Sequence, residues 1–360
     1  MRKLIAGMAA SLLVAILAFP CYGLSAENAY VLDADTGRVL YEKNGDDRSL
    51  IASTTKIMTA LVVIEQCNVL DRMRIPEEAV GIEGSSMYLQ AGEVLTIQEL
   101  LYGLMLQSGN DAAVALAIYC GGTVEGFAEL MNDKAHKLGM TDSHFVNPHG
   151  LDAPEHYATA RDLAVLSSYA MKNPIFAATV SCKTVRVGQR SMKNHNKLLW
   201  QFEGADGVKT GYTKKAGRIL VSSATREGRR LIAVTINAPD DWNDHTAMLT
   251  EGFNRFETTV VARKGMPVGY YEIAGGTAGV AEVVAAEDFV YPLAQDESVS
   301  FVLPKPGFIY APVVCGQSAG VAYVCVNGSV IGTCPVVFGR TVEQMQTPKK
   351  TIWQRLFGDN

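Results

Sequence analysis

The sequence predicts an α+β protein in which a mixed domain of helices and strands is followed by a smaller domain of strands alone. In the first domain, strand-like segments lie near residue 30 and between residues 183 and 236, with helical segments between them. We therefore expect one sheet that unites both ends of this domain. After about Thr258 the pattern changes to short β-like runs separated by glycine, proline and asparagine, which favours a separate all-β domain.

The composition is that of a globular protein with a slightly acidic balance. The chain has 360 residues, of which 48% are hydrophobic and 19% charged, and its formal net charge is −5 at pH 7. This length is sufficient for two domains. No basic stripe with interleaved aromatic residues occurs, so we expect no nucleic acid among the partners.

The N-terminus predicts an export signal over residues 1–26. Arg2 and Lys3 form its basic start, and the apolar run that follows is short for a membrane span, which needs about 20 residues. Cleavage after Ala26 would suit the requirement for small residues, with Gly23 as a second candidate. We therefore expect an exported protein at the outer face of a bacterial cell membrane, or in the periplasm or cell wall.

The cysteines contain no Cys-x-x-Cys pair and no metal-ligand spacing, so we expect no metal or other cofactor. Cys21 would suggest a lipoprotein, but Pro20 stands where a small residue should precede an acylated cysteine. An Asn327-Gly328 turn pairs residue 325 with 330 and residue 334 with 321, which separates Cys325 from Cys334 by roughly 13 Å. That distance is too long for a disulfide. Buried free thiols are expected at the positions that remain after export: Cys67, Cys120, Cys182, Cys315, Cys325 and Cys334.

The first domain is expected to begin with a hairpin over residues 29–41 that turns at Asp35-Thr36-Gly37. A helix follows Ser53, because apolar residues from Ile57 to Ile64 repeat at the spacing of one helix face. Further helices are expected over residues 97–106, 110–120, 121–140, 159–171 and 245–253. Further strands are expected over residues 183–187, 208–210, 218–224 and 230–236.

The second domain, residues 257–340, is expected to contain strands over residues 280–284, 299–303, 321–326 and 330–338. No catalytic group of residues occurs in it. A tail over residues 341–360 follows, in which Trp353 and Phe357 share an apolar face while Lys349 and Arg355 lie on the polar side. This pattern predicts an amphipathic helix that binds the outer face of a membrane without spanning it.

Ser53 and Lys56 form the first chemical motif. Residues three apart lie on the same side of a helix, so both side chains are expected to face one cleft. A serine hydroxyl becomes a good nucleophile only when a neighbouring base takes its proton. Lysine can be that base if burial or another cation lowers its pKa. Alone the motif is weak, because roughly one Ser-x-x-Lys is expected by chance in such a chain.

Two further motifs strengthen this interpretation. Ser108-Gly109-Asn110 lies on a short connection between two predicted helices, where side chains can face a cleft, and Lys209-Thr210-Gly211 lies on a predicted strand. Each has a chance probability of roughly a tenth or less. Ser-x-x-Lys, Ser-x-Asn and Lys-Thr-Gly in this order are typical of penicillin-recognising serine enzymes.

These motifs and their surroundings resemble the D-alanyl-D-alanine carboxypeptidases, the low-molecular-mass penicillin-binding proteins. The similar segments include residues 101–103, 108–113, 145–150 and 206–212, and the resemblance is strong over residues 27–256 and looser beyond. It implies a penicillin-binding, β-lactamase-like transpeptidase fold for that domain. It also implies removal of the terminal D-alanine from peptidoglycan pentapeptide stems outside the membrane, through an acyl-enzyme that β-lactam antibiotics also form.

The resemblance assigns roles to individual residues. Ser53 would attack the penultimate D-alanine carbonyl, Lys56 would accept the serine proton, and Ser108 would relay a proton to the leaving amine. Asn110 would orient Lys56 and the substrate amide, while Lys209 would keep Lys56 neutral and attract the substrate carboxylate. Backbone N–H groups of Ser53 and Tyr212 would form the oxyanion hole. The substrate-binding set is completed by Thr210, Gly211, Tyr212 and Thr213.

The chain departs from the family at one position. Some members carry an arginine after the last strand that contacts the substrate carboxylate, whereas residues 237–241 here read Asn-Ala-Pro-Asp-Asp. Recognition of the carboxylate would then rest on Lys209, Thr210 and Thr213. Turn chemistry explains Asn194 and His195 about as well as substrate contact does.

Three alternative functions remain open. A β-lactamase shares the acyl-enzyme, but that class has Ser-Asp-Asn as its middle motif and a glutamate that activates water. This chain has Ser-Gly-Asn, and Glu155 lacks a matching motif around it. A D,D-transpeptidase would differ only in the acyl acceptor. A catalytically silent wall-binding protein would act through the β domain, and the intact motifs argue against it.

Overall fold

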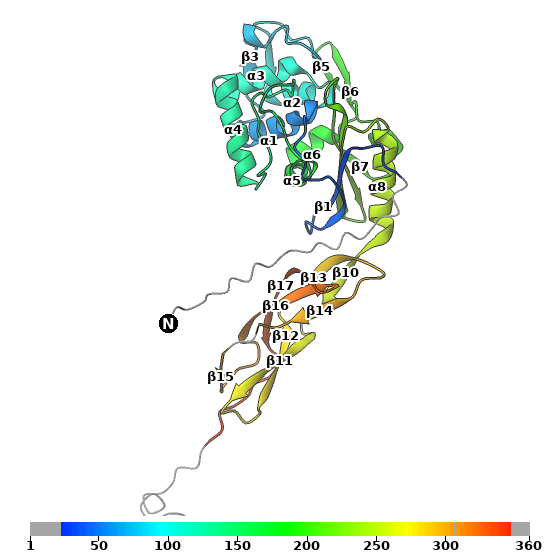
Figure 1. Cartoon of the computed structure of the whole chain (residues 1–360). Coiled ribbons are helices and arrows are strands. Elements are labelled where there is room, and N and C mark those ends of the chain that lie inside the picture. Colours follow the sequence, from blue (N-terminus) through cyan, green and yellow to red (C-terminus); the bar gives the residue numbers. More distant parts are fainter. Residues whose placement is uncertain (1–22, 305–306, 347–360) are drawn as a thin grey trace, which may run out of the picture. The chain divides into compact units, whose positions relative to one another are not determined.

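A computed structural model describes residues 23–304 and 307–346, and the chain divides into two compact units between Arg255 and Phe256 (Figure 1). The predicted membrane-binding helix at the end of the tail lies outside the described residues, as do residues 1–22 of the predicted export signal. The start of the predicted tail belongs with the second unit instead, because Val342 pairs with Val313 and Gln344 pairs with Gly276.

The first unit is built on a five-stranded sheet with the strand order β2-β1-β9-β8-β7. β1 (Asn28–Asp33) comes from the start of the unit and β9 (Arg229–Ile236) from near its end, and the two strands pair in antiparallel orientation. The prediction that one sheet unites both ends of the domain is therefore confirmed. The other strands are β2 (Val39–Lys43), β7 (Ala205–Thr213) and β8 (Gly217–Arg226).

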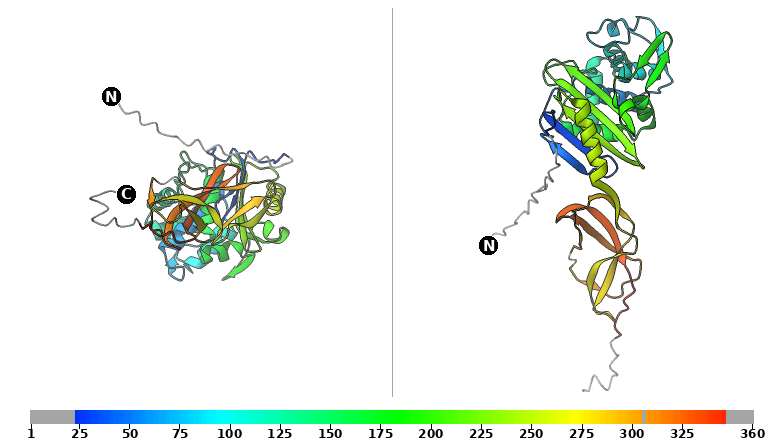
Figure 2. Two further views of the ribbon diagram at one scale, coloured as in Figure 1. Left: turned by 90° about the horizontal axis from the view of Figure 1, so that it is seen from below. Right: turned by 90° about the vertical axis from the view of Figure 1, so that its right-hand side faces the viewer.

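Helices cover both faces of this sheet. α5 (Ala160–Ala170) and α6 (Pro174–Ser181) lie on one face, and α8 (Asp241–Arg255) lies across the other (Figure 1; Figure 2). The mixed α+β class predicted for this domain is confirmed. The remaining helices are α1 (Lys56–Gln66), α2 (Ile97–Leu106), α3 (Asn110–Gly121), α4 (Val124–Lys137) and the short α7 (Leu198–Gln201).

Side-chain caps fix where several helices begin. Thr96 and Glu99 form a reciprocal capping box at the start of α2, in which Glu99 N donates to Thr96 Oγ1 at 3.1 Å. The helix expected over residues 121–140 begins later than predicted. Gly122 leaves the helical conformation with a φ of +75°, and the Thr123 side chain caps α4.

Short elements outside the main sheet connect the helices. β3 (Arg72–Arg74) pairs with β4 (Val94–Thr96), and the 3₁₀ helix η2 (Glu77–Ala79) lies between them in sequence. The strand predicted over residues 183–187 is present as β5 (Thr184–Val187). It pairs with β6 (Arg190–Lys193), which the sequence did not predict.

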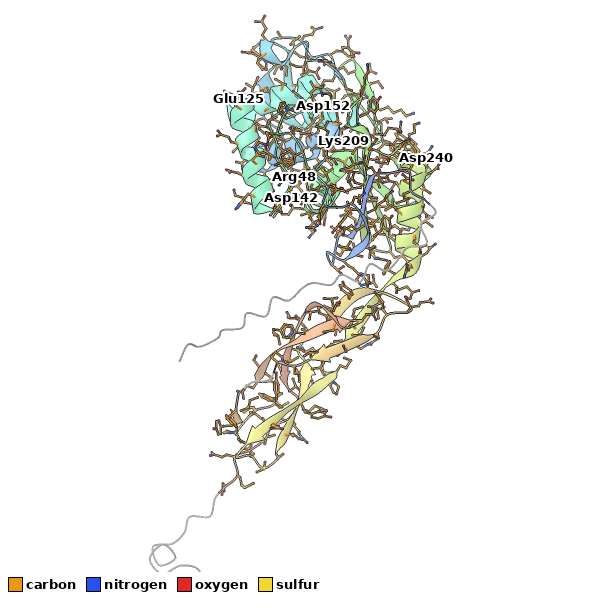
Figure 3. All side chains as sticks on the ribbon, viewed as in Figure 1. Arg48, Glu125, Asp142, Asp152, Lys209 and Asp240 are labelled. Carbon is orange, nitrogen blue, oxygen red and sulfur yellow. The ribbon has the colours of Figure 1, made fainter. Side chains whose placement is uncertain are left out.

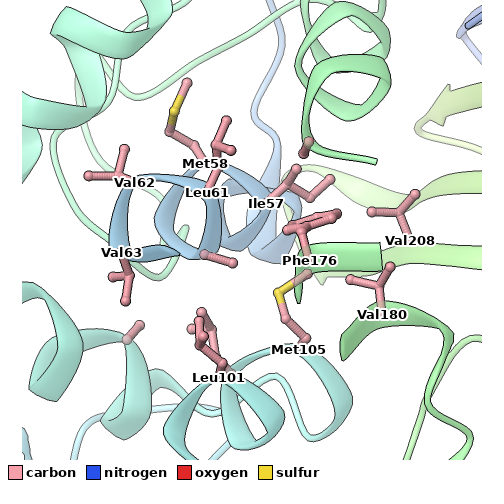
Figure 4. Close-up of a cluster of buried hydrophobic side chains, with 14 of the residues drawn as sticks. Ile57, Met58, Leu61, Val62, Val63, Leu101, Met105, Phe176, Val180 and Val208 are labelled. Atoms are coloured by element: carbon pink, nitrogen blue, oxygen red, sulfur yellow. The ribbon is translucent and has the colours of Figure 1, made fainter. Parts of the chain in front are cut away.

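α1 lies at the centre of the first unit and is buried along most of its length. Every residue from Lys56 to Ile64 is buried, so the helix is enclosed on all sides rather than along the single apolar face predicted. Apolar side chains from α2, α6 and β7 surround it, namely Leu101, Met105, Phe176, Val180 and Val208 (Figure 4). The helix that carries Lys56 is therefore fixed by packing over all of its faces.

The second unit consists of strands, as predicted. A six-stranded sheet has the order β14-β16-β17-β12-β11-β15, and β10 (Phe256–Ala262) pairs separately with β13 (Phe289–Ala294). Its strands are β11 (Pro267–Ala274), β12 (Val280–Ala285), β14 (Val299–Val302), β15 (Ile309–Tyr310), β16 (Ser318–Val326) and β17 (Ser329–Phe338).

The β16–β17 hairpin corrects one predicted register. Cys325 lies opposite Val330 as expected, but Cys334 lies opposite Ala322 rather than residue 321, because a bulge shifts the pairing between Val324 and Cys325. The cysteines in the described part of the chain are free thiols. Only Cys325 and Cys334 are buried, so the expectation of buried thiols is wrong for the rest, and Cys315 is exposed.

No helix among residues 23–304 and 307–346 is by itself long and apolar enough to cross a membrane. α3 and α4 have the length and apolar composition of a membrane span only when they are taken together, and a bend of 82° separates them.

His245 joins α8 to the sheet. Its Nδ1 lies 2.6 Å from Ser222 Oγ on β8, and its Nε2 lies 2.9 Å from Thr235 Oγ1 on β9. The ring is completely buried, and this burial lowers the pKa of His245 to about 3. The imidazole is therefore neutral in the folded protein at neutral pH.

We expect the free energy of unfolding to decrease as the pH falls from 6.5 toward 3, because only the unfolded chain readily protonates His245. Within that window, protonation of His245 in the unfolded chain should lower the free energy of unfolding by about 1.4 kcal/mol per pH unit. Above pH 6.5 the residue should cause no such loss of stability. Urea unfolding of the wild type and of His245→Gln, each at neutral and at mildly acidic pH, measures the effect. The variant should show the shallower pH dependence, and equal slopes would contradict this assignment.

Candidate active site

Ser53 lies on a single 3₁₀ turn, η1 (Ala52–Thr55), that leads directly into α1. The α-helix therefore begins at Lys56 rather than at Ser53. The tighter turn still brings Lys56 Nζ to 2.9 Å from Ser53 Oγ. The two side chains meet as the sequence spacing predicts.

Two glycines allow distant segments to pack against this turn. Gly150 has a φ of +87°, and a Cβ at this position would lie 1.8 Å from the carbonyl oxygen of Ala52. Gly211 on β7 would place a Cβ 3.2 Å from the backbone nitrogen of Ser53. Ala52 itself has a φ of +43°, which is uncommon for a residue with a side chain. The backbone around Ser53 is thus held by its neighbours in an unusual conformation.

Lys56 is fully buried, and its Nζ contacts three oxygen atoms. Ser53 Oγ lies at 2.9 Å, Asn110 Oδ1 at 2.7 Å and the backbone oxygen of His149 at 2.7 Å. The Asn110 amide can point only one way, because its Nδ2 donates to the carbonyl oxygen of Glu83. Two of the three partners of Lys56 can therefore only accept a hydrogen bond.

This set of partners suits a neutral amine. An amine has two hydrogens and one lone pair, so the hydrogens can serve Asn110 and His149 while the lone pair faces the Ser53 hydroxyl. Burial lowers the pKa of Lys56 well below its ordinary value, and the charge of Lys209 lowers it further, against an opposing effect of Asp111. The arrangement can therefore pass the Ser53 proton to Lys56.

Lys209 is a second buried lysine close to this centre. It lies on β7, and its Nζ donates to the carbonyl oxygen of Thr210 at 2.9 Å. Burial lowers the pKa of Lys209 to about 7, so the residue exchanges between charged and neutral forms near neutral pH. In its charged form Lys209 lowers the pKa of Lys56, but the burial of Lys56 lowers that pKa more.

Ser108 lies on the connection between α2 and α3, and Asn110 follows at the point where the sequence predicts that the next helix begins. Ser108 has a φ of +60°, and Asn110 is the first residue of α3. The adjacent Asp111 carboxylate accepts hydrogen bonds from Ser86 Oγ at 2.6 Å and from Leu89 N at 3.0 Å. A loop over residues 83–89 is thereby fixed beside the site, and the sequence analysis did not predict its involvement.

A cavity of about 360 Å³ opens over Ser53. Lys56, Asn110 and Lys209 are buried behind its wall rather than exposed to it. In the described part of the chain, no group of three or more histidine, cysteine or acidic side chains is arranged to hold a metal ion. The cavity is lined by Ser53, Ser85, Ser108, His195, Lys197, Thr210, Gly211, Tyr212, Arg218, Asp241 and Trp242.

Two residues considered in the sequence analysis, Thr213 and Glu155, do not line this cavity. Thr213 Oγ1 donates to Asp152 Oδ1 at 3.0 Å and accepts from Ala216 N at 3.0 Å. Asp152 is labelled in Figure 3, as is Lys209. Glu155, weighed as the base of a β-lactamase, is also absent from the lining. Its carbonyl oxygen lies 2.6 Å from His144 Nδ1.

Arg218 is a candidate that the sequence analysis missed. It lies on β8 directly opposite Tyr212 of β7, and its guanidinium donates to Asp241 Oδ1 at 2.7 Å. Burial raises the pKa of Asp241, and Arg218 opposes that rise. The acidic stretch over residues 237–241 therefore reaches the cavity with an arginine already paired to it. Extending the two predicted strands to their turn would have brought Arg218 beside the Lys-Thr-Gly motif.

Comparison with known protein families gives two matches. Residues 18–240 match the family described as D-alanyl-D-alanine carboxypeptidase, peptidase S11, and residues 256–344 match the C-terminal domain of penicillin-binding protein 5. DacF, a D-alanyl-D-alanine carboxypeptidase of Bacillus subtilis, is 33% identical over 86% of this chain and 84% of its own. DacC of Escherichia coli, of the same description, is 34% identical over 96% of this chain and 92% of its own.

Solved structures give a consistent result. Penicillin-binding protein 5 from Haemophilus influenzae matches with a TM-score of 0.76 and 28% identity, covering 91% of this chain and 100% of that one. The Streptomyces K15 DD-transpeptidase matches with a TM-score of 0.62 and 36% identity, covering 64% of this chain and 98% of that one.

We expect Gly150→Ala to reduce labelling of the protein by a fluorescent penicillin by about a hundredfold or more, because a Cβ would displace the turn that carries Ser53. Gly139→Ala is the matched control. Gly139 also has a positive φ of +74°, but a Cβ there meets nothing within 4 Å. The control should lose only stability, on the order of 1 kcal/mol. Comparable labelling of the two variants would show that packing against Ala52 is not required.

Proposed function

The chain belongs to the D-alanyl-D-alanine carboxypeptidase family, peptidase S11, and from this premise we propose that Ser53 is the nucleophile that forms its acyl-enzyme. Members of this family act on peptidoglycan peptides and bind β-lactams, and this protein is accordingly a hydrolase of the penicillin-binding class. One observation carries the assignment of Ser53. Its Oγ is the sole proton donor among the three oxygen atoms around the buried Lys56 amine.

Acylation begins when Ser53 Oγ attacks the carbonyl carbon of the penultimate D-alanine. The hydroxyl proton moves to the lone pair of Lys56 Nζ, and backbone N–H groups of Ser53 and Tyr212 stabilise the oxyanion. Ser108 relays the proton from Lys56 to the departing amine, which leaves as D-alanine, and Lys56 becomes neutral again. Water then hydrolyses the ester with Lys56 and Ser108 in the same roles, and this regenerates free Ser53.

Recognition of the terminal carboxylate falls to groups on β7 and β8. Thr210 lines the cavity beside Gly211, and Lys209 supplies positive charge from behind the wall. Arg218 adds a guanidinium from the neighbouring strand, which supports anion binding in a chain that lacks the later arginine. Thr213 acts indirectly, because its hydroxyl is engaged with Asp152.

Action outside the cytoplasm agrees with the family and with the predicted export signal. The contacts of Ser25 and Ala26 favour cleavage after Gly23 over cleavage after Ala26. Ser25 Oγ donates to Asp244 Oδ2 at 2.7 Å, and Ala26 N donates to the same oxygen at 3.1 Å. Removal of both residues would leave Asp244 without these partners. Membrane contact through the tail remains a proposal from its sequence.

We expect Ser53→Ala to abolish the penicillin adduct and Lys56→Arg nearly to abolish it, because arginine stays charged and cannot take the proton. In the wild type the acylation rate should rise with pH through the titration of Lys56 and remain appreciable near neutrality, since the pKa of Lys56 is lowered. Intact-mass spectrometry measures the adduct.

The exposed Lys172→Arg is the control for this charge-conserving change. An adduct on Ser53→Ala, or near-normal acylation of Lys56→Arg, is incompatible with the proposed mechanism.

We also expect the second unit to be dispensable for chemistry on small substrates, because every residue that lines the catalytic cavity lies between Ser53 and Trp242. A chain that ends at Glu257 should retain most of its kcat/KM on a soluble peptide ending in D-alanyl-D-alanine. Circular dichroism establishes that the shortened chain is folded. Complete inactivity of a folded shortened chain would refute this division of labour.

A further inference from the structure

A buried hydroxyl, that of Thr55, lies behind the turn that carries Ser53. Thr55 is completely buried, and its Oγ1 donates to the carbonyl oxygen of Ala52 at 2.8 Å. The same Oγ1 lies 2.8 Å from Nε2 of His156, which is also buried and comes 101 residues later in the chain. Nothing in the proposed chemistry uses this Thr55–His156 pair.

The surroundings of His156 fix the direction of both hydrogen bonds. Val146 N donates to His156 Nδ1 at 3.1 Å, so Nδ1 carries a lone pair. Burial lowers the pKa of His156 to about 4, so the imidazole is neutral at neutral pH and its single N–H hydrogen lies on Nε2. Nε2 therefore donates to Thr55 Oγ1, and the one hydrogen of that hydroxyl is directed to the Ala52 carbonyl.

The carbonyl that Thr55 holds belongs to the same peptide unit as the Ser53 N–H. The Ala52–Ser53 bond is trans, so its C=O and its N–H point in opposite directions. The C=O faces Thr55 and Gly150, neither of which lines the catalytic cavity. The N–H end lies beside Gly211, which does line it. A hydrogen bond on the buried side thus fixes where the Ser53 N–H points on the cavity side.

This peptide unit needs support from outside its own turn. Ala52 has a φ of +43°, and such a backbone conformation persists only where the surroundings hold it. No side chain caps the start of η1. An oxyanion donor is effective only when it is already aimed at the position that the oxyanion will occupy. Rotation of the Ala52–Ser53 peptide would turn the Ser53 N–H away from that position.

We propose that Thr55 and His156 are positioning residues, which aim the backbone N–H of Ser53 at the developing oxyanion. Thr55 holds the peptide directly, and His156 acts through Thr55. This inference rests on the proposed function, because it presumes that Ser53 N stabilises the oxyanion. Both residues lie behind the cavity wall, so their contribution is made in the transition state rather than in substrate binding.

The test compares Thr55→Val, which keeps the shape of the side chain and removes the hydroxyl, with Thr55→Ser, which keeps the hydroxyl. We expect the pseudo-first-order rate of acylation at a fixed penicillin concentration to fall about tenfold in Thr55→Val, less than the hundredfold or more that follows complete loss of an oxyanion donor. Thr55→Ser should retain most of the wild-type rate. His156→Phe should show a smaller loss than Thr55→Val, because the hydroxyl remains but is no longer oriented.

Thr235→Val is the matched control. Thr235 is also a buried threonine, and its Oγ1 lies 2.9 Å from Nε2 of the buried His245, but it does not line the cavity. This control should lose stability and keep the wild-type acylation rate. The rate is followed by rapid quenching and intact-mass spectrometry, and at a fixed penicillin concentration it does not depend on how much of the protein is folded.

Infrared spectroscopy of the penicillin acyl-enzyme gives a second measurement, which a loss of stability alone would not change. The ester carbonyl lies in the oxyanion hole, where hydrogen bonds weaken the C=O bond and lower its stretching frequency. With penicillin labelled by ¹³C at that carbonyl, Thr55→Val should shift the band to higher frequency. Thr235→Val should leave the band in place.

The outcomes separate this inference from the proposed function. An unchanged acylation rate or an unshifted carbonyl band in Thr55→Val would overturn the positioning role alone, as would equal losses in Thr55→Val and Thr235→Val. If Thr55→Val does not fold, the same two measurements on His156→Phe decide the question. A penicillin adduct that persists in Ser53→Ala would overturn the proposed function, and the positioning role with it.

Discussion

The burial of one amine, that of Lys56, is the constraint on which the first unit depends. A buried lysine is tolerated only if its hydrogens and lone pair are matched, and the three oxygen atoms around it come from widely separated segments. α1, which begins with Lys56, is enclosed on all sides. Asn110 at the start of α3 is held in place because its Nδ2 donates to the carbonyl oxygen of Glu83. The packing of the domain and its chemistry are therefore set by the same few contacts.

Two effects lower the pKa of Lys56, and their relative size can be judged. Burial is the larger, and the charge of Lys209 is second. Since the pKa of Lys209 is itself lowered to about 7, its charge is only partial near neutral pH, whereas burial acts at every pH. Desolvation by the surrounding helices thus dominates over repulsion between the two lysines. The sequence interpretation had emphasised Lys209, because a sequence motif shows which residues are charged but not how deeply they are buried.

The fold class, the uniting sheet and the meeting of Ser53 with Lys56 followed from periodicity and motif spacing. The sequence did not reveal the contributions of His149 and Glu83, since both act through carbonyl oxygens that every residue possesses. Arg218 was missed because its place depends on strand pairing across a turn. The β16–β17 register was misjudged by one residue, because a bulge leaves no mark in the alternation of side chains.

Two buried asparagines, Asn194 and Asn196, alternate with exposed neighbours along one segment, and this has a consequence for substitutions there. The amides anchor the segment through backbone carbonyls, which are indifferent to the side chains of the residues that carry them. The intervening positions make no comparable demand on the framework. Substitutions at the exposed Lys193, His195 or Lys197 should therefore disturb the framework less than substitutions at the two buried asparagines.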